Sequence, residues 1–234
     1  MALPKLNDSP KYEVKIPSTG KTVRFRPYLV KEEKVLMMAF ESGDQVAALK
    51  AIVDTIQACV VDDLDVARLA TFDIEYLFTQ IRSKSVGESS TLMIKCSECE
   101  KRTEYSFDVS AVKVEMPKID NLIELTPSVS IELEYPTYQT VMNSDLNGNE
   151  LEVGFIMAAN CIKTILTEEE AISTSDVSKE ELMEFVESMS QEQFRKIAEF
   201  LQTMPTMEHI AKFDCDWCGE GNEIVLKGMQ DFLS

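Results

Sequence analysis

Two Cys-x-x-Cys pairs stand far apart in the chain, Cys96 with Cys99 and Cys215 with Cys218. Each pair follows a stretch of alternating apolar and polar residues and precedes a short polar loop and a second alternating stretch, a pattern typical of a hairpin whose turn holds two thiols. Zn²⁺ takes four soft ligands in a tetrahedron, and one hairpin can direct only two thiolates at one point. The sequence therefore predicts that the two hairpins together bind one structural Zn²⁺ ion.

Other uses of paired cysteines fit this sequence less well. A redox Cys-x-x-Cys normally opens a helix after a strand, whereas residues 101–108 and 222–226 have the pattern of strands. Two disulfides would suit a small secreted domain, but residues 1–14 hold no apolar core of a signal peptide. A metal-free pair and two separate metal sites stay open as alternatives.

The other two cysteines and the single histidine are not expected to bind the metal. Cys59 and Cys161 lie in apolar helical stretches, where they suit small core positions. His209 lies six residues before Cys215 on the incoming strand, and four thiolates already complete a closed structural site. The sequence thus predicts a packing or surface role for the histidine and no open position for catalysis.

The charge of the chain restricts its partners. The 234 residues include 41 acidic and 23 basic side chains, a formal net charge of −18, and a surface of that sign repels phosphate backbones and anionic lipids. Hydrophobic residues make up 44% of the chain, enough to bury a substantial core. No apolar run reaches the roughly 18 to 20 residues of a membrane span. We therefore expect a globular, cytosolic protein that binds no nucleic acid.

Residues for enzyme chemistry are not evident. The chain has no glycine-rich phosphate loop and no Ser/His/Asp set, and the acidic residues gathered between positions 167 and 199 have the pattern of solvated helix faces. Residues 145–152 resemble a calcium loop, but Gly148 comes at the fourth position instead of the sixth, so this segment is interpreted as a turn. The sequence predicts a protein that is not an enzyme.

Residue periodicity predicts an α+β fold, in which amphipathic helices accompany small antiparallel sheets and two zinc-knuckle hairpins form one ribbon-like site. Capping-box patterns at Ser178 and Ser190 mark the starts of two helices. The predicted elements are a hairpin at 12–26, helices at 30–42, 44–60, 71–82, 151–166, 179–189 and 191–204, and strands at 112–116, 122–125 and 129–135.

These elements suggest three regions. An N-terminal hairpin and helical packet occupies residues 1–90, a composite zinc-ribbon module is made of residues 91–116 and 205–234, and a region of strands and helices is inserted between them at 117–204.

Three segments carry a resemblance to a known family. Residues 25–36 after the first hairpin, residues 73–88 of the third helix, and residues 210–219 together with 226–232 resemble the baseplate hub assembly proteins of T4-like contractile-tailed phages. The resemblance covers most of the chain. It implies a non-enzymatic hub subunit or assembly factor that binds other phage baseplate or tail proteins. Such a protein is made in the host cytoplasm, and its place in the virion would be the tail baseplate.

A rival hypothesis comes from another class of protein. A zinc ribbon could belong to a regulator of host transcription, and an acidic chain could mimic DNA in a basic groove. Twelve methionines suit contact with protein partners, because Met adapts to irregular surfaces, although Met37, Met38, Met157, Met183 and Met189 could equally fill the core. Trp217 could anchor an interface or pack against the opposite hairpin, and oligomer formation is left open.

Overall fold

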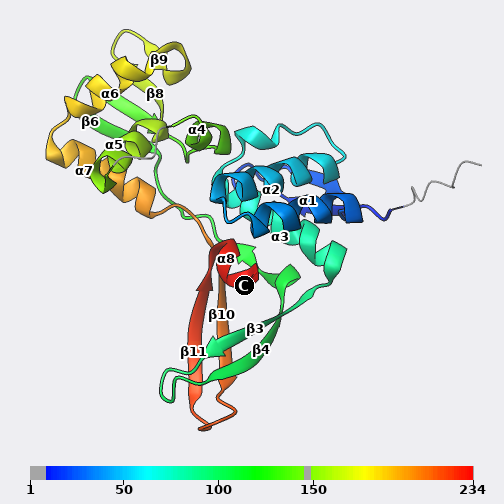
Figure 1. Ribbon diagram of the computed structural model, residues 1–234. Coiled ribbons are helices and arrows are strands. Elements are labelled where there is room, and N and C mark those ends of the chain that lie inside the picture. The colour runs from blue at the N-terminus through cyan, green and yellow to red at the C-terminus, as the bar shows by residue number, and fades with distance from the viewer. Residues whose placement is uncertain (1–8, 145–148, 234) are drawn as a thin grey trace, which may run out of the picture. The chain divides into compact units, whose positions relative to one another are not determined.

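The computed structural model describes residues 9–144 and 149–233. Helices and small antiparallel sheets alternate along the chain, which confirms the predicted α+β class (Figure 1). The chain divides into two compact units, one made of residues 1–116 and 206–234 and the other of residues 117–205. Within the described part of the chain, no helix combines the length and the apolar character needed to cross a bilayer.

The first unit begins with the predicted hairpin of β1 (Tyr12–Lys15) and β2 (Thr22–Phe25). Gly20 has a φ of 68° in the connecting turn, a conformation that glycine adopts without steric cost. The turn is fixed to a helix further along the chain, because Ser18 donates both its N–H and its hydroxyl to the buried carboxylate of Asp73.

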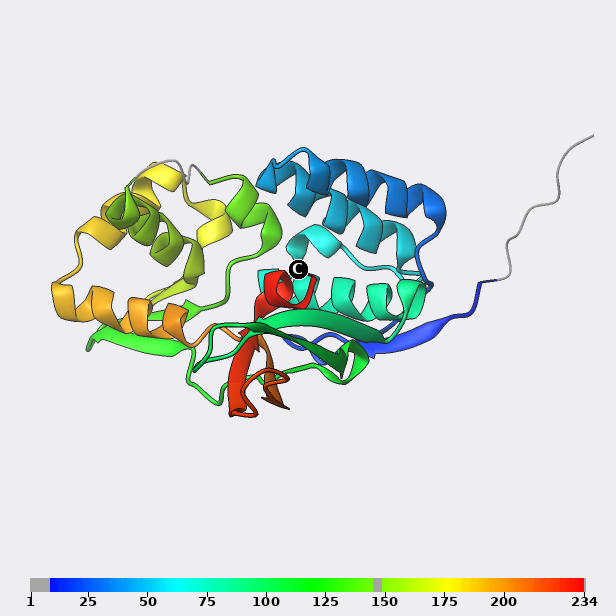
Figure 2. The ribbon, with the colours of Figure 1, turned by 60° about the horizontal axis from the view of Figure 1, so that its bottom comes forward.

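Three helices follow, α1 (Val30–Glu41), α2 (Gln45–Cys59) and α3 (Thr71–Val86). Asp44 caps α2 as predicted and accepts the N–H groups of residues 46 and 47. A short 3-10 turn, η1 (Val66–Arg68), precedes α3, and α2 contacts both α1 and α3 (Figure 2). The buried apolar side chains of the hairpin and helices include Ile16, Val23, Phe25, Leu36, Ile52, Ile56, Leu77, Phe78 and Ile81.

Two long hairpins complete this unit, β3 (Ser89–Lys95) with β4 (Arg102–Asp108) and β10 (Met207–Asp214) with β11 (Gly221–Lys227). They lie beside each other (Figure 1) and bury a common apolar cluster with α8 (Gly228–Leu233) at their base. The fully buried members of this cluster include Leu92, Phe107, Val109, Met207, Ala211 and Phe232.

The predicted strand at 112–116 is wrong in its extent. A 3-10 turn, η2 (Val109–Ala111), comes first, and only β5 (Lys113–Val114) pairs with β10. Val112 is buried in the apolar cluster at the base of the hairpins, and Pro117 has no N–H with which to continue a ladder.

The second unit is built on an antiparallel sheet in the order β6 (Leu122–Thr126), β7 (Val129–Leu133), β8 (Ile162–Thr167) and β9 (Ala171–Ser173). One face of this sheet packs against α5 (Glu150–Cys161), α6 (Lys179–Glu187) and α7 (Gln191–Gln202) around Ile131, Leu133, Val186, Ile197 and Phe200. The capping boxes predicted at Ser178 and Ser190 are present at the starts of α6 and α7. A short helix α4 (Tyr138–Met142) and a 3-10 turn η3 (Thr174–Asp176) complete the unit.

The helix predicted at 151–166 is wrong over its last five residues, 162–166. Helix α5 ends at Cys161, and the β-branched residues that follow form β8, which pairs with β7 on one side and β9 on the other. Pairing on both edges outweighs the helical periodicity of these apolar residues. The acidic residues 168–170 consequently lie in the turn between β8 and β9, while those of α6 are exposed as predicted. Residues 145–148 of the suggested turn lie outside the described residues.

Candidate metal centre

The four cysteines of the two Cys-x-x-Cys pairs come together at the tips of the long hairpins. Their sulfur atoms all lie within 4.8 Å of one another, with Cys96 Sγ 3.7 Å from Cys218 Sγ and Cys99 Sγ 3.6 Å from Cys215 Sγ. Tetrahedral ligation with Zn–S bonds of about 2.3 Å places sulfur atoms about 3.8 Å apart. The predicted convergence of the two hairpins is therefore present, and its spacing suits one ion.

The competing roles of these cysteines do not match the structure. All six cysteines are free thiols, so the described residues contain no disulfide. Each Cys-x-x-Cys lies in a turn between two strands and not at the start of a helix, which differs from the redox arrangement. Cys59 and Cys161 are fully buried at the ends of α2 and α5. Burial raises the pKa of Cys59 to about 11 and that of Cys161 to about 12, which suits neutral core thiols.

The two cysteine turns have the same backbone geometry. In each turn the carbonyl of the first cysteine accepts the N–H of the residue after the second cysteine, which is Glu100 for Cys96 and Gly219 for Cys215. These two residues have φ values of 60° and 73°. Glycine reaches this region without steric cost, but Glu100 adopts it against its side-chain preference. The fold therefore tolerates strain at the first turn in order to direct both of its sulfurs at the site.

Asn222 on β11 ties the second hairpin to the first cysteine turn. Its side-chain Nδ2 lies 3.5 Å from Cys96 Sγ and donates to the carbonyl of Glu220 at 2.8 Å. Its Oδ1 accepts the N–H and the hydroxyl of Ser97, both at 2.9 Å. The amide is buried, and these bonds fix the orientation of the Cys96 sulfur, as supporting hydrogen bonds do for ligands in metal sites.

Thr103 on β4 makes the reciprocal contacts from the first hairpin to the second turn. Its hydroxyl donates to Cys215 Sγ at 3.7 Å and accepts the N–H of Asp216 at 3.3 Å. Thr103 and Asn222 each stand seven residues after the first cysteine of their own pair. Each hairpin thus supports the first cysteine of the other, an arrangement that the sequence analysis missed although the matching positions were a usable signal.

The electrostatics of the cluster favour a bound cation. The backbone N–H of Cys99 lowers the pKa of the Cys96 thiol. Burial opposes ionisation of Cys215, but backbone N–H groups of its own turn outweigh it and lower its pKa to about 6. The N–H of Glu220 favours the Cys218 thiolate, yet burial and the three neighbouring sulfur atoms raise its pKa to about 12. Without a cation, Cys218 is thus favoured as a neutral thiol, and all four sulfurs would ionise together only around a positive charge.

His209 takes no part in the cluster. Its Nε2 lies 3.0 Å from the hydroxyl of Tyr105, and its ring stacks on Phe107 with centroids 4.6 Å apart. Burial lowers the pKa of His209. The packing role predicted for this residue agrees with its position on β10, where it packs against Tyr105 and Phe107 of β4.

Trp217 packs against the opposite hairpin, one of the two roles predicted for it. Its Nε1 donates to the carbonyl of Arg102 on the opposite hairpin at 3.0 Å, and the ammonium of Lys101 lies 4.7 Å from its ring centroid. The side chain is nevertheless 63% exposed. The indole is therefore held in one orientation while much of its surface faces solvent.

The fold and the cysteine cluster define a structural α+β protein in which two hairpins from distant parts of the chain are joined. The family model described as T4 bacteriophage base plate protein matches residues 9–234, and the chain belongs to that family. No curated protein and no solved structure matches it. Membership confirms the resemblance to T4-like baseplate proteins and gives the chain a structural role in the phage tail baseplate, in a family that is generally non-enzymatic.

Proposed function

We propose that this protein is a subunit or assembly factor of the baseplate hub that acts by binding other tail proteins, and that one Zn²⁺ held by Cys96, Cys99, Cys215 and Cys218 fixes its fold. The observation that carries the zinc proposal is the convergence of four sulfur atoms within 4.8 Å of one another. The buried hydrogen bonds of Asn222 and Thr103 to two of these sulfurs support it.

The physical role of the metal is that of a clamp. A two-stranded hairpin alone is marginally stable in water, and the apolar cluster between these two hairpins ends at Ile94 and Phe213, two residues before the cysteine turns. The entropy of closing a long loop grows only logarithmically with its length. Metal–thiolate binding on the order of 10 kcal/mol offsets that cost, so the ion would hold the tips of both hairpins together.

The partner surfaces are proposed to lie outside the metal centre. In this view the composite module of residues 91–116 and 205–234 is a rigid platform, and the helices of residues 1–90 and of the inserted region 117–204 contact other tail proteins. Four thiolates would complete the coordination of the ion, so the site would supply no catalysis. Assembly would take place in the host cytoplasm.

Metal analysis of matched variants tests the clamp. We expect about one zinc per chain in the wild type and in Cys59→Ala, and little in Cys215→Ala, because only the second variant removes a ligand. The two positions are both buried, so the comparison separates loss of a ligand from loss of a core thiol. A wild-type chain that folds normally without metal would contradict the clamp.

Affinity capture from infected cells tests the hub role. A tagged chain should recover other baseplate or tail proteins. Recovery of a host polymerase or nuclease in their place would favour the rival hypothesis of a zinc-ribbon regulator or an acidic DNA mimic.

A further inference from the structure

Helix α1 leaves most of its apolar residues uncovered. Only Glu32 and Leu36 of this helix are buried. Met37 is 58% exposed and Phe40 is 47% exposed, although both are large apolar side chains. The exposed apolar residues on and beside α1 are Leu29, Val30, Val35, Met37, Met38, Phe40 and Val46. Met37 and Phe40 stand three residues apart and share one face of the helix, and an exposed apolar face of this kind marks a contact site.

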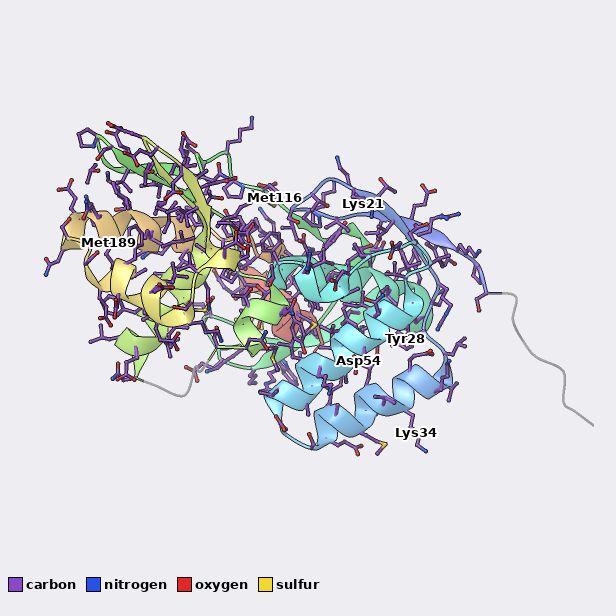
Figure 3. The ribbon with its side chains drawn as sticks, turned by 90° about the horizontal axis from the view of Figure 1, so that it is seen from above. Lys21, Tyr28, Lys34, Asp54, Met116 and Met189 are labelled. Carbon is purple, nitrogen blue, oxygen red and sulfur yellow. The ribbon has the colours of Figure 1, made fainter. Side chains whose placement is uncertain are left out.

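This surface continues into a groove between α1 and α3. The groove holds about 230 Å³ and is lined by Leu36, Met37 and Phe40 from α1 and by Phe78 and Val86 from α3. Tyr28 closes it just ahead of α1, while Lys34 lies on the side of α1 that faces away from α2 (Figure 3). The volume suits a few apolar side chains of a partner.

Two opposite charges border the apolar lining, Glu33 from α1 and Arg82 from α3. Among the described residues, neither of them has an ion-pair partner. A partner that fits this groove should therefore offer one positive and one negative group on either side of an apolar centre.

The groove is also electrically neutral in a strongly acidic protein. Its lining holds one acidic and one basic side chain, Glu33 and Arg82, whereas the whole chain carries a net charge of −18. Two copies of such a chain repel each other over most of their surface. A face without net charge is one on which they can meet.

We propose that the groove of α1 and α3 binds a second copy of this chain about a two-fold axis. A two-fold interface uses the same patch on both subunits, so it requires a patch that complements itself. An apolar centre with one acid and one base meets that requirement, because Glu33 of each copy then faces Arg82 of the other. This inference uses no metal ligand and is independent of the proposed clamp.

Charge reversal tests the pairing on the full-length chain. By sedimentation equilibrium, we expect a dimer for the wild type and dimerisation at least about tenfold weaker for Glu33→Arg or Arg82→Glu alone, because each change places two like charges opposite each other twice. An equimolar mixture of the two single variants should dimerise again, because every pair across that interface is then complementary. The double variant Glu33→Arg with Arg82→Glu should also dimerise.

A matched pair of methionine variants tests the apolar part of the proposed dimer interface. Met37→Lys should weaken dimerisation, whereas Met93→Lys on β3 should not, although Met93 is 56% exposed against 58% for Met37. A wild-type chain that is monomeric at all concentrations would overturn the proposal. So would a dimer that the two charge reversals leave unchanged.

Discussion

The hydroxyl of Tyr105 lies 3.0 Å from Nε2 of His209 and joins β4 of the first long hairpin to β10 of the second. His209 lies opposite Leu226 of β11, four residues beyond Asn222 and further from the cysteine turns. The rings of Tyr105 and Phe107 pack against it. The only histidine of the chain therefore holds the two hairpins together through packing and one hydrogen bond, in addition to the cysteine cluster at the tips.

The environment of His209 predicts that the free energy of unfolding depends on pH. Burial lowers its pKa below the ordinary value of 6.5, so the unfolded chain binds more protons than the folded chain near that pH. The free energy of unfolding should therefore fall as the pH drops through about 6.5. A His209→Phe variant should lack this part of the dependence. Titration of the imidazole by NMR checks the cause, and a folded-state pKa at or above 6.5 would contradict it.

The reciprocal contacts of Thr103 and Asn222 predict an effect on metal binding. Asn222→Leu should weaken metal affinity by roughly 10 to 100-fold, the range usual for residues that support a ligand, and Thr103→Val should act in the same direction. Absorption spectra of the Co²⁺-loaded chain should shift in both variants, since the donors to two thiolates change. Asn160→Leu serves as the control, because that amide binds Ser144 in the other unit. Equal spectra in all three variants would contradict the role of Asn222 and Thr103 as supports of the cysteine sulfurs.

The separate core of residues 117–205 predicts a divided response to metal removal. Chelation should increase hydrogen exchange in β3, β4, β10 and β11, which the proposed clamp would hold together, while β7 and β8 keep their protection because their own apolar cluster surrounds them. Mass spectrometry of exchanged peptides can resolve the two sets of strands. Simultaneous loss of protection in both units would show that the metal stabilises the chain as a whole.

Glu32 at the start of α1 predicts a local loss of stability. Its carboxylate accepts from Arg26 at 2.9 Å and from the N–H of Leu29 at 2.8 Å. Glu32→Gln should lower the free energy of unfolding by about 1 to 3 kcal/mol, the usual worth of hydrogen bonds to a charged group. Glu41→Gln at the exposed end of the same helix should change it by less than about 0.5 kcal/mol. Chemical denaturation at neutral pH measures both.

The effect of the Glu32→Gln change on the free energy of unfolding should depend on pH. Burial opposes ionisation of Glu32, but the hydrogen bonds from Arg26 and Leu29 outweigh it and lower the pKa below 4.5. Its contribution is therefore fully present above about pH 4.5 and is lost as the pH falls through the lower folded-state pKa. The difference between wild type and Glu32→Gln should shrink over that range, and a difference that grows on acidification would contradict the ion pair.

The acidic surface predicts the absence of DNA binding. In a gel-shift assay at about physiological salt, no complex should form below the roughly 10⁻⁴ to 10⁻⁶ M typical of non-specific binders. The basic residues near the first cysteine turn, Lys95, Lys101 and Arg102, could contact only a few phosphates. A tight, sequence-dependent complex would favour the transcription-regulator hypothesis.

Short stretches of sequence were enough to predict the helix starts and the two cysteine hairpins. The cap at Asp44 and the capping boxes at Ser178 and Ser190 each place a side chain against its own helix, so a few neighbouring residues contain all the information. The two cysteine hairpins were predictable for the same reason, and the demand of a metal for four ligands then indicated that they meet.

The missed features depend on residues far apart in the sequence. Residues 162–167 form a strand because β7 and β9 lie on either side of them, and no short window contains that fact. The matching positions of Thr103 and Asn222 indicate a shared role, but which cysteine each one contacts depends on how the two hairpins lie beside each other. The groove of α1 and α3 likewise exists only after helices distant in sequence have packed.

The order of the two hairpins along the chain has a consequence during synthesis. The ribosome makes Cys96 and Cys99 first, then the whole of residues 117–205, and only afterwards Cys215 and Cys218. At about 5 to 20 residues per second, the first pair waits on the order of 10 s for its counterpart. The intervening unit has its own apolar core and can fold in that interval. Closure of the cluster is thus a late event of maturation. A nascent chain that stalls before residue 215 contains only Cys96 and Cys99 of the four cysteines.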